Sequence, residues 1–308
     1  MSDASVKREA LQKIRALISK GQKQQAEGIA YLFKVDERHA SIDEITFYAK
    51  VLMEIGFIQE AERSLKAAIA KANKANFTHQ LESLFWQMRT KPDLRRMRSG
   101  VALSHALSLP GINSVLDVGS GGEEHALRFA QANKMVHCVD YGTSIYVQNS
   151  EALADTERHP NIRKTIGDFM TFKSTEKYDL VWCSHVLEHQ VNPNLFLKKC
   201  LSHLNDNGWL AVTVPPLKHP IVGGHVTLWN AGILLYQFVL AGNDCSSALI
   251  MNYDYNITVM VPKAPVELPT LDYDSGDVDR LSKFFPPDCA ENFDGRMYGH
   301  AIRNLTRC

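Results

Sequence analysis

The sequence predicts an α/β protein in which an all-helical region precedes a doubly wound, mostly parallel sheet. Three observations predict this class. Apolar residues recur at helical spacing through roughly the first hundred positions, strand-like runs alternate with helical stretches from about Val101, and a glycine-rich loop follows the first of these runs. Short apolar strands separated by helices are typical of parallel sheets that are covered on both faces.

The composition is that of an ordinary globular protein, with 45% hydrophobic and 22% charged residues among 308. The 34 basic residues balance the 34 acidic ones, so we expect no nucleic-acid partner. The 6 cysteines lie far apart without a CxxC pair, which excludes a zinc ribbon and favours a reducing compartment. The N-terminus has no apolar signal-peptide core, and no apolar run is long enough to span a membrane. We therefore expect a cytoplasmic protein.

Two glycines divide the helical region into similar helix pairs. Gly21 and Gly56 are 35 positions apart, and an alanine follows each of them five residues later, Ala26 and Ala61. This spacing is close to the period of tetratricopeptide repeats. We interpret residues 1–98 as a tetratricopeptide-like region, with a plain helical cap as the alternative. Two repeats do not bury a continuous core alone, so these helices need further helices, the neighbouring domain, a protein partner or self-association.

The second region alternates strands and helices in order along the chain. Strands are predicted over 114–118, 135–139, 178–182 and 209–214, then a helix over 231–240 and a last strand over 257–261. Beyond Lys263 the chain is rich in Pro and Asp and has one short amphipathic piece, Val278 to Phe285. We predict one domain over 99–263 and a C-terminal tail or lid over 264–308.

A ligand site is predicted at the end of the first strand of this domain. Asp117 ends the strand and Gly119-Ser120-Gly121-Gly122 follow, while Asp140 ends the next strand, where a carboxylate can accept both hydroxyls of a ribose. A dinucleotide places its pyrophosphate on such a loop, but Asp117, Glu123 and Glu124 would repel it. A ligand carrying an ammonium and a sulfonium suits these acids. The electrostatics favour S-adenosylmethionine.

Four stretches carry a resemblance to a known family: LDVGSGG at 116–122, VHCVDYG at 136–142, IGDFMTF at 166–172 and YDLVWCSHVLEH at 178–189. With them, the chain from about Val101 to Lys263 resembles the class I S-adenosylmethionine-dependent methyltransferases of the broad group called type 11. The resemblance implies a seven-stranded, Rossmann-like methyltransferase sheet with S-adenosylmethionine as cofactor and S-adenosylhomocysteine as product.

The resemblance also implies roles for individual residues. Asp117, Gly119 and Gly121 line the methionine part of the cofactor, and Asp140 holds its ribose. Asp168 and Phe169 flank the adenine, and Cys183 and Ser184 contact the cofactor through backbone. The full implied set is Asp117, Gly119, Ser120, Gly121, Asp140, Tyr141, Asp168, Phe169, Cys183 and Ser184. The chain departs from the family at Glu123, where a third glycine is frequent.

The stretch after the strand at 178–182 carries candidate catalytic residues. If it is helical, His185, Glu188 and His189 lie at i, i+3 and i+4 on one face. Three interpretations remain open. In the first interpretation, one of the histidines is the general base that removes a hydroxyl proton, since the ordinary pKa of histidine is near 6.5. The trio binds a divalent ion, as a similar Glu-x-x-Glu-His pattern does in some quinone-type methyltransferases. Alternatively, Glu188 and His189 only stabilise the fold. We expect no metal here.

The loop after the fourth predicted strand is expected to select the acceptor, because loops at this edge of a sheet line the ligand crevice. It carries His225, a further candidate base, and Trp229. Two segments resemble parts of bacterial methyltransferases that are found among the enzymes of polysaccharide and natural-product synthesis: the run HVTLWN and the tail run DVDRLSKFFPP. We therefore expect methyl transfer to a hydroxyl of a sugar or bacterial surface glycan. The alternatives are a small-molecule or quinone-type O- or N-methyltransferase, and a non-catalytic interaction protein on this fold.

Overall fold

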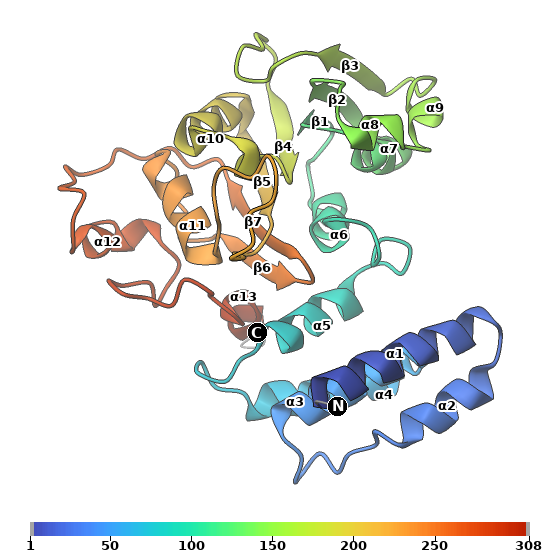
Figure 1. The fold of residues 1–308 in the computed structure, drawn as a ribbon. Coiled ribbons are helices and arrows are strands. Elements are labelled where there is room, and N and C mark those ends of the chain that lie inside the picture. The colour runs from blue at the N-terminus through green and yellow to red at the C-terminus, as the bar shows by residue number, and fades with distance from the viewer. Residues whose placement is uncertain (1–2, 306–308) are drawn as a thin grey trace. The chain divides into compact units, whose positions relative to one another are not determined.

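The computed structural model describes residues 3–305 and divides them into two compact units (Figure 1). The helical unit comprises residues 3–90 together with 298–305, and the sheet unit comprises residues 91–297. The predicted boundary at residue 98 therefore lies inside the sheet unit. None of the helices between residues 3 and 305 is long and apolar enough to cross a membrane.

The helical unit contains two helix pairs that turn in the same way. Its helices are α1 (Asp3–Ser19), α2 (Lys23–Tyr31), α3 (Ile42–Ile55), α4 (Ile58–Lys71), α5 (His79–Arg89) and α13 (His300–Leu305). Gly21 and Gly56 both have left-handed φ angles, of 73° and 90°. In each turn the residue after the glycine donates its N–H to a carbonyl in the last helical turn, the Schellman arrangement. The tetratricopeptide-like class of this region stays a prediction.

Small and apolar side chains fill the helical core. Ala26 and Ala61, the alanines that follow the two turning glycines, are fully buried beside Ile14 and Val51. A small residue at each of these positions lets α1 to α4 pack closely. The sequence pattern thus placed the helix pairs and the residues through which they pack.

The end of the chain returns to the helical unit. Glu82 of α5 is fully buried and accepts hydrogen bonds from the backbone N–H of Gly299, at 2.9 Å, and from the indole of Trp86, at 3.2 Å. Gly299 has a left-handed φ of 69°, and a Cβ there would lie 2.6 Å from the ring of Phe77. Residues 298–305 therefore belong to the helical core and not to the predicted tail over 264–308.

Gly299→Ala is expected to destabilise the helical unit by at least about 1 kcal/mol, because alanine is strained at a left-handed φ and its methyl would overlap Phe77. Thermal unfolding followed by circular dichroism measures this change. Gly28→Ala is the matched control. Gly28 lies inside α2 with no atom within 4 Å of an added Cβ, so this variant should be more stable by about 0.5–1 kcal/mol. Equal melting temperatures for the two variants would contradict the tight packing at Gly299.

The sheet unit is built on seven strands in the order β3-β2-β1-β4-β5-β7-β6. The strands are β1 (Ser114–Val118), β2 (Met135–Asp140), β3 (Ile162–Ile166), β4 (Tyr178–Ser184), β5 (Leu204–Val214), β6 (Leu249–Tyr253) and β7 (Asn256–Pro262). The first five strands in the order pair in parallel, and β7 pairs antiparallel with both β5 and β6. The predicted seven-stranded, mostly parallel sheet is confirmed.

Helices pack against the strands of the sheet (Figure 1). The helices of this unit are α6 (Gly100–Ser108), α7 (Glu124–Gln131), α8 (Ile145–Gln148), α9 (Leu153–Thr156), α10 (Pro193–Ser202), α11 (Ala231–Leu240) and α12 (Asp277–Arg280). α7 packs against β1, β2 and β3, whereas α10 and α11 pack together beside β5 and β7. α11 has the bounds that the sequence pattern predicts.

The segment after β7 is part of the sheet unit as far as residue 297. Leu281 is fully buried in the main hydrophobic core, and Phe285 and Cys289 join it there. The segment predicted as a tail or lid over 264–308 is divided between the two units: residues up to 297 belong to the sheet unit, and residues 298–305 belong to the helical unit. All five cysteines among the described residues are buried free thiols, and Cys308 lies outside the described residues.

Candidate functional site

The glycine loop at the carboxyl end of β1 is tightly packed at Gly119. Gly119 has a left-handed φ of 68°, and a Cβ on it would lie 2.4 Å from a methyl group of Val186. Its N–H donates to the carbonyl of Val139 at 2.8 Å, which ties the loop to β2. A backbone held this close to its neighbours exposes peptide groups that a ligand can approach.

Asp140, at the end of β2, holds two loops together. One carboxylate oxygen accepts the N–H of Gly121 at 2.9 Å, and the other accepts the N–H of Gly142 at 2.7 Å. A carboxylate offers about four acceptor positions, so each oxygen keeps one for a further donor such as a ribose hydroxyl. The ribose role predicted for Asp140 fits this geometry and stays a prediction.

Glu123 stands where the family frequently has a third glycine, and it adopts a left-handed φ of 60° as a glycine would. α7 begins only at the next residue, Glu124. The Glu123 side chain is buried. Its carboxylate accepts a hydrogen bond from the hydroxyl of Thr156 and forms an ion pair with Lys164 at 2.7 Å. Its charge is therefore compensated within the protein, unlike that of its neighbour Asp117.

Asp117 is a buried acid that lacks a compensating partner. It is 1% exposed, and its Oδ2 has no hydrogen-bond partner among the residues that the structure describes. Burial, followed by the nearby charges of Glu123 and Asp140, raises its pKa from 3.8 to about 8. A cationic ligand would relieve this cost. The unpaired oxygen, the tight Gly119 loop and the open acceptor positions of Asp140 together fit S-adenosylmethionine.

The remaining predicted cofactor residues lie around the same strand ends. Tyr141 is 61% exposed, and burial together with a hydrogen bond to Asp168 raises its pKa. Phe169 is buried, with its ring 5.4 Å from that of Phe196, so its side chain supports the loop from within the core. Three further predicted residues also lie here: Ser120 in the glycine loop, Cys183, a buried thiol 3.7 Å from that of Cys200, and Ser184, whose hydroxyl is 2.7 Å from that of Ser99.

The stretch from Ser184 to His189 is not an α-helix, so the condition for a shared helical face of His185, Glu188 and His189 is not met. His185 has a left-handed φ of 58°, and its N–H still donates to Thr213 of β5 at 2.8 Å, as a continuation of the sheet. Only a short 3₁₀ turn, η1 (Leu187–His189), follows. The sheet ladder therefore overrides the helical pattern at this point.

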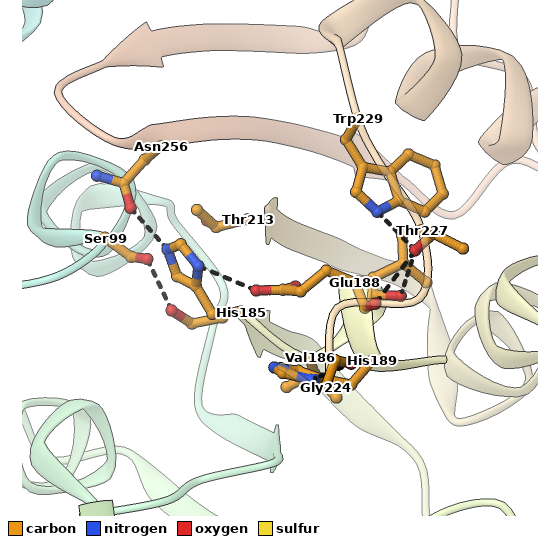
Figure 2. Close-up of polar contacts among 12 residues, drawn as sticks. Ser99, His185, Val186, Glu188, His189, Thr213, Gly224, Thr227, Trp229 and Asn256 are labelled. Carbon is orange, nitrogen blue, oxygen red and sulfur yellow. Dashed lines mark hydrogen bonds and ion pairs between the residues drawn. The ribbon is translucent and has the colours of Figure 1, made fainter. Parts of the chain in front are cut away.

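His185 uses both ring nitrogens within the protein (Figure 2). Nε2 lies 2.9 Å from Oδ1 of Asn256, and Nδ1 lies 3.1 Å from Oε1 of Glu188. The amide nitrogen of Asn256 donates to the carbonyl of Tyr253, which places its oxygen toward His185. Both ring nitrogens of His185 are thus engaged with other side chains. His185 therefore has no free nitrogen with which to act as a base or to hold a metal.

His189 and His225 form a pair instead, with their rings 5.0 Å apart at 86°. Nδ1 of His189 lies 2.8 Å from the carbonyl of Gly224, so it donates there and leaves Nε2 as the acceptor (Figure 2). The loop that carries His225 is fixed at Glu188, whose carbonyl accepts the N–H of Val226 at 2.9 Å. The structure thus brings together two of the three predicted histidines.

A pocket opens beside this pair at the end of β5. Its lining is mostly apolar and includes three prolines, one lysine, one threonine and three rings: Pro215, Pro216, Lys218, Pro220, Ile221, Val222, His225, Thr227, Leu228, Trp229 and Tyr255. Trp229 is buried and donates its indole N–H to Thr227 at 3.0 Å, and Lys218 lies 3.9 Å above the ring of Tyr255. The lining thus combines apolar side chains with a few polar groups.

A family model described as a methyltransferase domain matches residues 58–237, which is more than half of the chain. The chain belongs to this methyltransferase family. Membership confirms S-adenosylmethionine, predicted from the glycine loop and its acids, as the cofactor of this methyltransferase. The family match begins inside the helical unit, at the first residue of α4.

Curated relatives of this methyltransferase act on oxygen or nitrogen. The (S)-coclaurine N-methyltransferase of Papaver somniferum is 28% identical over 47% of this chain and 50% of its own length. A ubiquinone biosynthesis O-methyltransferase of Nitrosospira multiformis is 27% identical over 43% of this chain and 56% of its own. The chain thus spans about half the length of these relatives. A Burkholderia thailandensis 1,6-didemethyltoxoflavin-N1-methyltransferase structure with bound S-adenosylhomocysteine gives a TM-score of 0.44 and 16% identity over 55% of this chain and 77% of its own.

Sequence reasoning missed several residues that shape the methyltransferase site. Gly142 could have been found, because it lies in the quoted stretch after β2 and ties Asp140 in place. Asn256 and Lys164 gave no such signal. Asn256 contacts His185, and Lys164 contacts Glu123. The two members of each pair are far apart in the sequence, and only the order of the strands brings them together.

Proposed function

We propose that this methyltransferase methylates an oxygen of an apolar, ring-bearing small molecule bound in the pocket at the end of β5. The observation that carries the proposal is this pocket, in which prolines and Trp229 surround His225 while His189 lies alongside. Ubiquinone biosynthesis O-methyltransferases among the relatives support an oxygen acceptor. The sugar or glycan expected from the sequence finds no such support, since the pocket offers few polar groups for several hydroxyls.

Different residues of the sheet unit bind the methyl donor and assist removal of the hydroxyl proton. Asp140 and the glycine loop hold the methyl donor, and positioning of donor and acceptor supplies most of the acceleration. An oxygen–methyl bond forms as the sulfur–methyl bond breaks, S-adenosylhomocysteine leaves, and the hydroxyl proton must be removed. A hydroxyl has a pKa far above neutrality, so it needs such help, which His189 and His225 are placed to give.

The test begins with the melting shift produced by S-adenosylhomocysteine. At about one hundred times its dissociation constant it stabilises a protein by about 2.7 kcal/mol, roughly 5–10 °C for a protein of this size. Release of S-adenosylhomocysteine is then measured with phenols, catechols, sugars and amines as acceptors. We expect turnover of phenolic acceptors, reduced about 10²-fold or more in His225→Ala.

His219→Ala is the control, because this histidine lies in the same loop but outside the pocket lining. It should keep wild-type turnover. Turnover of amines alone, unchanged in His225→Ala, would contradict the oxygen acceptor.

A further inference from the structure

Three side chains beside the pocket converge on one point. Glu188, His189 and His225 each offer a ligand atom, and these three atoms lie within 4.8 Å of one another. Glu188 and His189 belong to η1, and His225 belongs to the loop after β5 that is fixed on Glu188 through Val226. The cluster therefore joins the end of β4 to the loop that lines the pocket.

Glu188 is a buried carboxylate with one oxygen unsatisfied. Its side chain is 1% exposed, its Oε1 is held by His185, and its Oε2 has no hydrogen-bond partner within residues 3–305. A buried carboxylate oxygen without a partner destabilises the folded protein. A cation at this point would remove that destabilisation.

His189 is prepared in a corresponding way. His189 donates its Nδ1 proton to the carbonyl of Gly224 at 2.8 Å, which fixes the tautomer and leaves Nε2 with a free lone pair. Metal-bound histidines characteristically donate their other N–H to a carbonyl or carboxylate in this manner. The ring of His225 stands nearly perpendicular to that of His189, so the two rings do not stack face to face.

We propose that Glu188, His189 and His225 form a binding site for a divalent transition-metal ion. Two imidazoles and one carboxylate suit Zn²⁺, Co²⁺, Mn²⁺ or Fe²⁺, whereas Mg²⁺ and Ca²⁺ prefer all-oxygen ligands. Ligand atoms around a tetrahedral ion with bonds near 2.1 Å are about 3.4 Å apart. The most widely separated pair of ligand atoms, which lie within 4.8 Å of one another, must therefore approach by up to about 1.4 Å. This set replaces the sequence-based trio of His185, Glu188 and His189, because His185 has no free nitrogen.

The site has a use in catalysis that rests on the proposed function. Three protein ligands leave at least one position of the ion open, as in catalytic rather than structural sites. The acceptor oxygen, bound in the pocket that His225 lines, reaches this position. With the ion bound, His189 and His225 would act as its ligands and not as bases. The ion would lower the pKa of the hydroxyl, and the proton would pass to water before the oxygen takes the methyl group.

Titration of chelator-treated full-length protein with Co²⁺ tests the site without any acceptor. We expect one equivalent to bind with a visible d–d absorption band, and Zn²⁺ to displace it. His225→Ala and Glu188→Gln should each weaken binding by about a hundredfold or more, whereas His219→Ala should bind as the wild type does. Each variant must keep the melting shift with S-adenosylhomocysteine, which shows that the sheet unit is folded.

The outcomes separate the metal site from the proposed function. Binding of Co²⁺ that His225→Ala abolishes supports the site even when no acceptor is methylated. Absence of Co²⁺ binding, or binding that is unchanged in His225→Ala, overturns the site. Methylation of hydroxyls by a protein that binds no Co²⁺ also overturns it, while the proposed function stands.

Discussion

Asp140→Ala is expected to abolish measurable binding of S-adenosylhomocysteine. The carboxylate of Asp140 joins the N–H groups of Gly121 and Gly142, so its loss releases both loops that it connects. The ribose hydroxyls lose their predicted acceptor at the same time. Hydrogen bonds to charged groups contribute about 1.5–3 kcal/mol each, so the loss of two or more predicts at least about a hundredfold weaker binding. Isothermal titration calorimetry measures the change.

Two further variants make this prediction sharper. Asp140→Asn keeps one acceptor oxygen without the charge, and we expect its affinity to lie between those of Asp140→Ala and the wild type. Asp206→Ala removes an acid whose side chain is 99% exposed, and it should bind as the wild type does. Wild-type affinity in folded Asp140→Ala would show that this carboxylate holds the loops but not the cofactor.

The cofactor-free protein is expected to lose stability as the pH rises from about 4 to 8, because of Asp117. Burial raises the pKa of this carboxyl from 3.8 to about 8, so in this range the folded protein holds a proton that the unfolded chain has released. The contribution of Asp117 then lowers the free energy of unfolding by up to about 1.4 kcal/mol per pH unit. Above pH 8 the carboxylate is ionised in both states and the slope disappears.

Asp117→Asn isolates this contribution, since the amide is neutral at every pH. Without cofactor, the variant should unfold at a higher denaturant concentration than the wild type at pH 8, and the difference should shrink towards pH 5. Asp206→Asn, on the surface, should follow the wild type throughout. Parallel pH profiles for Asp117→Asn and the wild type would exclude a buried proton on Asp117.

Cofactor binding should show the opposite pH dependence at the same residue. The ionised carboxylate is the form that attracts a cation, so the affinity for S-adenosylhomocysteine, which carries an ammonium group, should increase as the pH approaches 8. In Asp117→Asn the affinity should be lower and should not change over this range. Calorimetry in buffers of different ionisation enthalpy also reports the proton released by the wild type.

Local sequence patterns were sufficient for the parts of the fold that are themselves local. The glycine loop after β1, the acid that ends β2 and the helix α11 all follow from short-range composition and spacing. β3 and β6 were not placed from their own patterns. The strand-like alternation is weak in β3, which lies at the sheet edge with most of its residues partly exposed, and β6 is a short partner of β7.

The candidate catalytic cluster could not be predicted because it depends on contacts between distant segments. The helical spacing of His185 and His189 was misleading, since the β4–β5 ladder holds His185 in a left-handed conformation. His225 joins Glu188 only because its loop docks on the η1 backbone. Sequence order gives no measure of such docking, so the three histidines could be named but not paired.

The return of residues 298–305 to the helical unit affects the order in which the protein can fold during synthesis. The helical unit is discontinuous along the chain, and the entire sheet unit is translated between its two parts. Until the ribosome reaches Gly299, the buried carboxylate of Glu82 lacks the backbone donor that it accepts in the finished protein. The core formed by α1 to α5 can therefore be completed around Glu82 only after the sheet unit has been synthesised.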